Sequence, residues 1–111
     1  MGDRVLMQVF SSVSGEFGPV VYGHWSGAYA DQAAADLKAR MGDRHDDVAY
    51  ASARLVQCLI DASGGQDGCL SFGIWNADHK LTDKDSHGDR GCILIDASKG
   101  YAAANAPAVS A

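Results

Sequence analysis

The sequence predicts one α+β domain, a four-stranded antiparallel sheet with two helices on one face, in the element order ββααββ. Three observations lead to this class. Apolar runs of strand character lie towards both ends of the chain, two segments between them have helical spacing, and Gly- and Ser-rich turns separate the elements. The length of 111 residues fits a single core, because two smaller cores would bury too little surface to fold.

The first two strands are expected at residues 4–11 and 20–25. Residues 4–11 alternate and are rich in β-branched and aromatic side chains, which puts Val5, Met7 and Val9 on one face. Residues 12–19 carry Ser, Gly and Pro at turn positions before strand character resumes. The two strands are therefore expected to form a β-hairpin.

Two helices are expected between residues 27 and 65, where the apolar residues change to helical spacing. The first has a core face made mostly of alanine, so the element that packs on it must come close: Ala30, Ala33, Ala34, Leu37 and Met41. It starts near Asp31 and stops at Gly42. Asp46 or Asp47 can cap the second helix, which ends at residues 63–65 and has one apolar stripe: Val48, Ala51, Leu55, Leu59 and Ala62.

The last two strands are expected at residues 70–75 and 91–96. The first alternates, whereas the second is a continuous apolar run typical of a strand buried on both faces. Residues 76–90 between them form a polar loop long enough to serve as a binding loop. From residue 97 on, small residues without a period predict a tail, so the domain is expected to span residues 1–96 and the tail residues 97–111.

Composition excludes several classes of protein. The formal net charge of −5 argues against direct nucleic-acid binding, because domains of that kind neutralise phosphates with Lys and Arg. No stretch reaches the roughly 18 apolar residues of a membrane span, and the first residues do not begin a signal peptide, so we expect a cytoplasmic protein. Cys58, Cys69 and Cys92 are odd in number and irregularly spaced, which predicts reduced, structural thiols.

The acidic residues are nearly all of one type: of 14, 13 are aspartates and the other is Glu16. Asp disfavours helix interiors and bonds nearby backbone amides, so most of these residues are expected at caps and turns. A second interpretation is that short carboxylates project negative charge towards a basic protein surface.

Nothing in the sequence predicts catalysis. No dinucleotide-binding, Walker-type, nucleophile-elbow or His-Glu-x-x-His motif occurs. Residues 83–89 match the first seven positions of a calcium loop, but Leu94 stands at the twelfth, where a Glu is required. His79 and His87, with Cys69 or an aspartate, lack the ligand spacing of a zinc site. We therefore expect a non-enzymatic protein without metal or cofactor.

Tyr22, His24 and Trp25 form a dense aromatic cluster at the end of the second expected strand. Two interpretations compete. If Tyr22 and His24 point to one face and Trp25 to the other, Trp25 anchors the core against the helices. Alternatively, His24 or Trp25 is exposed and serves as an interface hot spot, for which Trp and Tyr are enriched.

Several motifs resemble those of a group of small proteins encoded by phages and prophages. They are Tyr22-Gly23-His24-Trp25-Ser26-Gly27, Asp47-Val48-Ala49-Tyr50 with Ala53-Arg54, Ser71-Phe72-Gly73-Ile74, and Ile93-Leu94-Ile95-Asp96. His45 and Ser71 depart from that group's pattern, which has an aromatic residue and a glycine at these places. The resemblance implies a mobile-element origin and an inhibitor of bacterial defence, such as an anti-CRISPR protein, and it carries no site residue across.

Three functions are open at this point. The first is a non-enzymatic inhibitor that presents carboxylates to the nucleic-acid-binding groove of a host protein or protein–RNA complex, such as a CRISPR effector. Its expected contributors are Asp43, Asp46, Asp47, Asp61, Asp67, Asp78, Asp83, Asp85 and Asp89. The second is a phage accessory domain, monomeric or homodimeric, that binds a phage protein or self-assembles through an apolar and aromatic face including Tyr22, His24 and Trp25. The third is a small enzyme that uses His79 or His87 with a nearby carboxylate.

Overall fold

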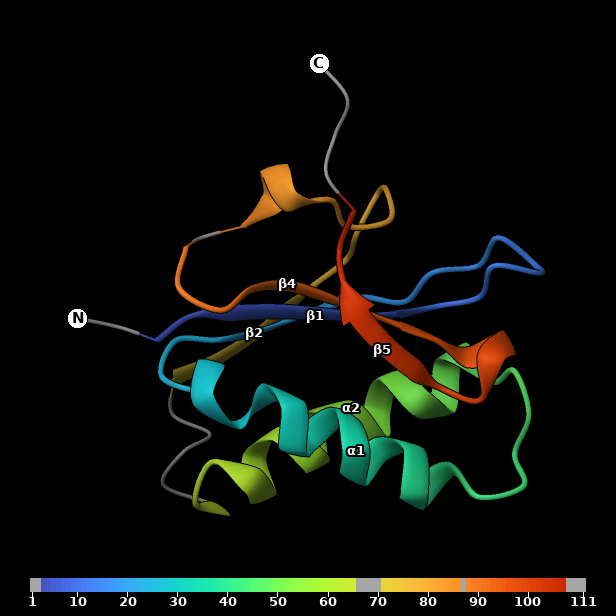
Figure 1. Cartoon of the computed structure of the whole chain (residues 1–111), viewed down its shortest axis with the longest axis horizontal. Coiled ribbons are helices and arrows are strands. Elements are labelled where there is room, and N and C mark those ends of the chain that lie inside the picture. Colours follow the sequence, from blue (N-terminus) through green and yellow to red (C-terminus); the bar gives the residue numbers. More distant parts are fainter. Residues whose placement is uncertain (1–2, 66–70, 87, 108–111) are drawn as a thin grey trace.

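The computed structural model, which describes residues 3–65, 71–86 and 88–107, is an α+β fold with two helices against one face of a mixed sheet (Figure 1). The described residues form five strands in the order β3-β2-β1-β4-β5. The strands are β1 (Val5–Phe10), β2 (Val20–Gly23), β3 (Phe72–Trp75), β4 (Gly91–Asp96) and β5 (Ala102–Asn105). The helices are α1 (Ala30–Met41) and α2 (Val48–Ala62).

The expected hairpin is confirmed, but the purely antiparallel four-stranded sheet is wrong. β1 pairs antiparallel with β2, with Val5 opposite Gly23, and it pairs parallel with β4, with Val5 opposite Gly91. The chain returns through the helices, β3 and residues 76–90, and therefore enters β4 at the end of the sheet where β1 begins. The continuous apolar run of β4 fits this place, because central parallel strands are buried on both faces.

The expected tail contributes the fifth strand. β5 pairs antiparallel with β4, with Ile95 opposite Ala103, so the boundary expected at residue 96 is corrected: the domain continues through β5. Tyr101 is buried beside it; its hydroxyl donates to the carbonyl of Arg44 at 2.8 Å and accepts from the amide of Asp47 at 3.0 Å. The alternation of buried and exposed residues that marks a strand is missing because all residues of Ala102–Asn105 are exposed. Residues 108–111 lie outside the described residues.

Both helices form as the periodicity predicts. Every residue of the expected core face of α1 is buried, and the helix stops at Gly42, which has a φ of 56°. Asp47, one of the two expected caps, accepts a hydrogen bond from the amide of Tyr50 at 3.1 Å. The alanines of α1 let α2 approach closely, and both helices cover the sheet face that carries Val5 and Met7.

Residues 76–86 cover the opposite face of the sheet (Figure 1). Leu81 is buried in a second apolar cluster with Leu6, Val20 and Leu94. Gln8 on β1 is fully buried and binds this segment through two hydrogen bonds. Its side-chain amide accepts from the amide of Leu81 at 2.8 Å and donates to the carbonyl of His79 at 3.3 Å. The long polar loop thus has a structural role as the cover of one face. None of the described helices is long and apolar enough to cross a membrane.

Candidate functional site

β3 lies at one edge of the sheet and carries apolar side chains to both faces. In the described part of the chain it pairs with β2 only, with Val21 opposite Ile74 and Val20 opposite Trp75. Because opposite residues share a face, Ile74 projects on the helix side with Val21, and Trp75 projects on the other side. The strand has neither a charged residue nor a proline, the devices that usually protect an edge from pairing.

The outer edge of β3 presents backbone groups to which another extended segment can bind. The amide of His24 donates to the carbonyl of Ser71 at 3.1 Å. In an antiparallel ladder alternate residues bond to the same neighbour, so Ser71, Gly73 and Trp75 face β2. The N–H and C=O groups of Phe72 and Ile74 therefore point away from β2, towards the outer edge.

An aromatic row runs from this edge across the end of the sheet: Trp75, Tyr22, His24 and Trp25. Adjacent ring centroids are 5.9, 6.1 and 4.7 Å apart, and the hydroxyl of Tyr22 and Nδ1 of His24 are 2.7 Å apart. Trp25 is 53% exposed and Trp75 is 41% exposed. Large aromatic side chains of this kind dominate binding energy when a partner buries them.

The interpretation that Trp25 anchors the core is wrong. After Gly23 the chain bends so that Ser26, not Trp25, fills the inward position. A Cβ on Gly23 would lie only 2.8 Å from the Cβ of Ser26, so this close approach leaves no space for an indole. The exposed alternative for Trp25 is therefore the one that the structure supports.

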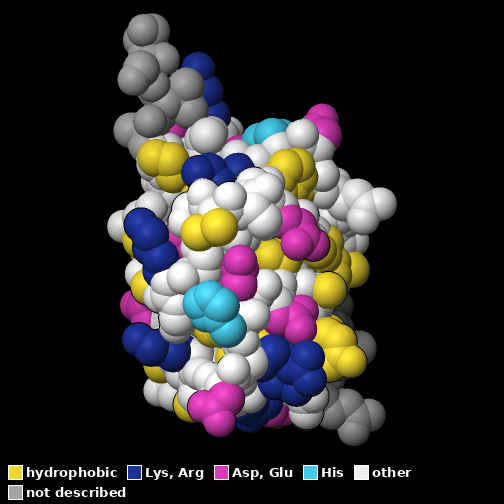
Figure 2. Space-filling view, turned by 90° about the vertical axis from the view of Figure 1, so that its right-hand side faces the viewer, with side chains coloured by type: hydrophobic (Ala, Val, Ile, Leu, Met, Phe, Trp, Pro, Cys, Tyr) yellow, Lys and Arg dark blue, Asp and Glu magenta, His cyan; other side chains and the backbone are white. Residues whose placement is uncertain are grey.

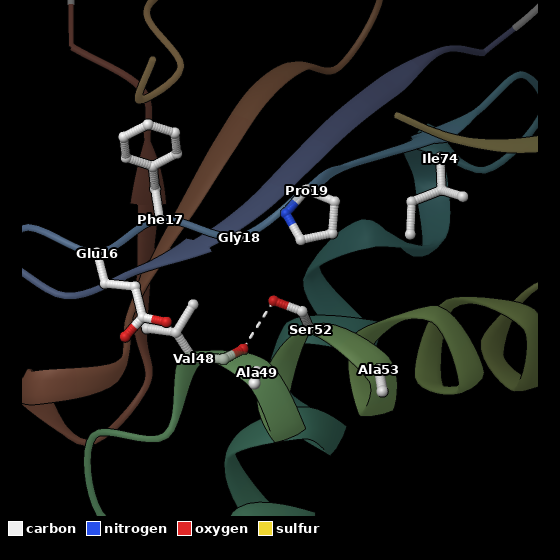
Figure 3. Close-up of a pocket in the computed structure, with 9 residues that line it drawn as sticks. All are labelled: Glu16, Phe17, Gly18, Pro19, Val48, Ala49, Ser52, Ala53 and Ile74. Carbon is white, nitrogen blue, oxygen red and sulfur yellow. Dashed lines mark hydrogen bonds between the residues drawn. The ribbon is translucent and has the colours of Figure 1, made fainter. Parts of the chain in front are cut away.

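On the helix side, the edge borders an apolar groove of about 450 Å³. Phe17, Pro19 and Ile74 lie on one side of it and Ala49 and Ala53 of α2 on the other (Figure 3). The remaining lining residues are Glu16, Gly18, Val48 and Ser52. The hydroxyl of Ser52 donates to the carbonyl of Val48 at 2.7 Å, so this polar group of the α2 wall is already paired within the helix.

The apolar surface continues along α2 beyond this groove. A second hollow shares Ala49 and Ala53 with it and is bounded by Tyr50 and Arg54. Tyr50 is exposed, and the guanidinium of Arg44 lies 4.0 Å from its ring centroid. We call the aromatic row, the outer edge of β3 and the groove together the edge surface. Tyr22, His24 and Trp25 of this surface were expected from the sequence, whereas Phe17 and Ile74 were not. Phe17 lies in a segment that reads as a turn, and Ile74 lies in an apolar strand whose residues also suit a core position.

Five of the expected acidic residues are paired with basic side chains in the described part of the chain. Three of them pair with arginine side chains: Asp47 with Arg44, Asp61 with Arg40 and Asp89 with Arg4. Asp78 and Asp85 both bond to the ring of His79. Asp43 is exposed, Asp46 is half-buried with a φ of 50°, Asp83 begins the short 3₁₀ helix η3 (Asp83–Asp85), and Asp67 lies outside the described residues. On the face shown in Figure 2, acidic side chains alternate with Lys, Arg and His.

Capping and local pairing account for much of the aspartate bias. Asp47 caps α2, and Asp96 accepts from the amide of Ser98 at 3.1 Å, which caps the short 3₁₀ helix η4 (Ala97–Lys99). The bond from the amide of Tyr50 is the main cause that holds the pKa of the Asp47 carboxyl below its ordinary value. Burial opposes the shift at Asp96, but hydrogen bonds from the hydroxyls and amides of Ser12 and Ser98 hold the pKa of that carboxyl low. Such carboxylates serve the fold first and are less available to a partner.

The described cysteines are buried and poorly suited to nucleophilic chemistry. Burial raises the pKa of Cys58, and burial together with the charges of Asp85 and Asp83 raises the pKa of Cys92 to about 11. Cys69 and His87 lie outside the described residues. Among those that are described, no group of three His, Cys, Asp or Glu side chains is arranged to hold a metal ion.

Comparisons with protein-family models, with curated proteins and with solved structures gave no match. The resemblance to small phage proteins therefore stays a prediction that rests on the motif residues alone.

Proposed function

We propose that this chain is a non-enzymatic protein-binding domain whose partner docks on the edge surface. The observation that carries the proposal is the exposure of three large apolar side chains beside one unprotected edge strand: Trp25, Ile74 and Trp75. Exposed apolar side chains that cluster in this way typically mark interaction sites, whereas isolated ones need no explanation. None of the three belongs to either cluster of buried apolar residues in the described part of the chain.

The geometry of the edge favours a partner that supplies an extended apolar segment. Such a segment can pair with the outward N–H and C=O groups of Phe72 and Ile74, as in β-strand addition. Because side chains alternate along a strand, neighbouring side chains of the segment would contact the groove and the aromatic row in turn. Backbone pairing supplies affinity here, and the two flanking surfaces supply specificity.

Capture from a bacterial lysate followed by affinity measurement tests this proposal. The immobilised chain is compared with Trp25→Ala and with the control Val13→Ala, which removes an exposed apolar side chain outside the edge surface. Burial of an interface Trp is typically worth about 2 kcal/mol or more, so Trp25→Ala should weaken binding of the captured protein about 30-fold. Val13→Ala should bind like the wild type. Equal binding by all three proteins contradicts the proposal.

An acidic inhibitor of a nucleic-acid-handling complex, such as a CRISPR effector, is the second candidate. It is supported by the net charge of −5 and by the concentration of Asp78, Asp83, Asp85 and Asp89 in one segment. Salt separates the two candidates, because exposed charges are screened between about 50 mM and about 500 mM NaCl, whereas apolar contacts are not weakened. Binding that survives high salt and Asp83→Asn, but not Trp25→Ala, favours the edge surface.

A further inference from the structure

We propose that His79 is a pH-sensitive clasp that holds residues 76–86 closed over the second face of the sheet. Its ring lies between two carboxylates of the same segment: Nδ1 bonds to Asp78, and Nε2 is 2.9 Å from Oδ1 of Asp85. An imidazolium can donate from both nitrogens, whereas a neutral imidazole can donate from only one. Loss of the proton therefore leaves one carboxylate facing a ring nitrogen without a hydrogen between them.

The clasp lies in the part of the segment that is hydrogen-bonded to the sheet through Gln8. The carbonyl of His79 accepts from Nε2 of Gln8, and two residues further on the amide of Leu81 donates to Oε1 of the same side chain. Asp85 also accepts from the amide of Thr82 at 2.8 Å, which closes the capping box of η3. His79 thus joins the start of the segment to η3, directly above the buried Gln8.

The charges around the ring favour the protonated state. The hydrogen bond to Asp78, followed by the bond and charge of Asp85, raises the pKa of His79. Lys80 points towards Phe10, 4.8 Å from its ring centroid. The sheet faces the clasp with the uncharged Gln8 amide and with Cys92, whose thiol stays protonated because burial and the charges of Asp85 and Asp83 raise its pKa to about 11. Because this pKa is raised by closure, the contribution of the clasp is complete below about pH 6.5, the ordinary value for histidine, and is lost as pH rises through the raised value.

Opening of the segment uncovers a defined surface. Leu81 would leave its contacts with Leu6, Val20 and Leu94, which exposes the second face of the central strands. The segment begins directly after Trp75, whereas Trp75 itself stays paired with β2 in the sheet. Closure can be measured on the chain alone, without any partner.

Hydrogen exchange of the Leu81 amide tests the clasp, since this N–H is bonded to Gln8 only while the segment is closed. Exposed ion pairs are weak, so we expect its protection factor, corrected for intrinsic exchange, to fall roughly two- to fivefold between about pH 6 and about pH 9. The amide of Leu55 in α2 serves as the internal reference for global opening. His79→Gln should remove this pH dependence, and the control His45→Gln should keep it.

Asp78→Asn provides a second variant should His79→Gln fail to fold. The side chain of Asp78 is 95% exposed and bonds to His79, so its loss weakens the clasp without disturbing the capping box. We expect this variant to show a smaller pH dependence than the wild type. A wild-type Leu81 amide whose protection is independent of pH, or a pH dependence unchanged in Asp78→Asn and His79→Gln, overturns the proposal.

Discussion

Gly18 allows the loop before β2 to lie directly on α2, and Gly18→Ala tests how tightly this wall of the groove is built. A Cβ at this position would lie 2.3 Å from Oγ of Ser52 but 3.4 Å from its Cβ. The first distance is a clash, and the second is an ordinary, close contact. The conflict therefore comes from one hydroxyl, and Ser52→Ala should relieve it.

The loss of unfolding free energy expected for Gly18→Ala depends on whether the Ser52 side chain or the loop moves to relieve the clash. Ser52 can rotate its hydroxyl away, but it is buried and would give up its bond to the carbonyl of Val48, which costs about 1 kcal/mol. If the loop moves instead, overpacking costs about 1–3 kcal/mol. We therefore expect Gly18→Ala to lose about 1–2 kcal/mol of unfolding free energy, or roughly 4–8 °C in Tm for a domain of this size.

Urea unfolding of a double-mutant cycle measures this coupling. Ser52→Ala alone should change the unfolding free energy by less than about 0.5 kcal/mol, since Ala favours the helix. In the Ser52→Ala background, Gly18→Ala should cost at least about 1 kcal/mol less than in the wild type. Gly73→Ala is the matched control, because its added Cβ meets only ordinary contacts, beginning at 3.8 Å. Additive effects in the cycle would refute the proposed contact between Gly18 and the hydroxyl of Ser52.

Two further predictions concern the hydrogen bonds of Tyr101 and the reactivity of the buried cysteines. Tyr101→Phe removes both hydrogen bonds that join the start of β5 to the loop between the helices, and should cost about 1–2 kcal/mol in urea unfolding; Tyr29→Phe, at an exposed site, should cost nothing measurable. Cys58 and Cys92 should resist iodoacetamide at about pH 8 in the folded protein and react in urea, as read by peptide mass mapping, because burial disfavours both thiolates. Rapid labelling of Cys92 in the native state would contradict its burial.

Local patterns predicted most of the elements, and long-range pairing accounts for most of the errors. The stripe from Val48 to Leu59 defines α2 without reference to the rest of the chain, as does the apolar run of β4. The parallel pairing of β1 with β4 depends on residues more than eighty positions apart, for example Val5 and Gly91. β5 was missed because its four exposed residues are mostly alanines, which have no periodic apolar pattern.

The candidate site was predictable only in part for a similar reason. An aromatic cluster at residues 22–25 is visible in the sequence, but whether Trp25 points inward depends on the close approach of Gly23 and Ser26. Ile74 has the apolar character of a core residue, and it is exposed only because β3 is an edge strand. The aspartates were expected both as caps and as a binding surface; two of them, Asp47 and Asp96, serve as helix caps, and the binding surface stays a prediction.

Ile74→Pro tests the central claim, that a partner pairs with the outer edge of β3, more directly than any other change. Proline removes the outward N–H of Ile74 while leaving the bonds between β3 and β2, and proline is tolerated at edge positions of this kind. The matched control, Ile74→Val, keeps both the N–H and an apolar side chain. The measurement is the affinity of each folded variant for the protein captured by the wild type. We expect Ile74→Val to bind nearly as well as the wild type and Ile74→Pro to lose binding at least about tenfold, the effect of about 1.4 kcal/mol; a folded Ile74→Pro variant with wild-type affinity would contradict docking at this edge.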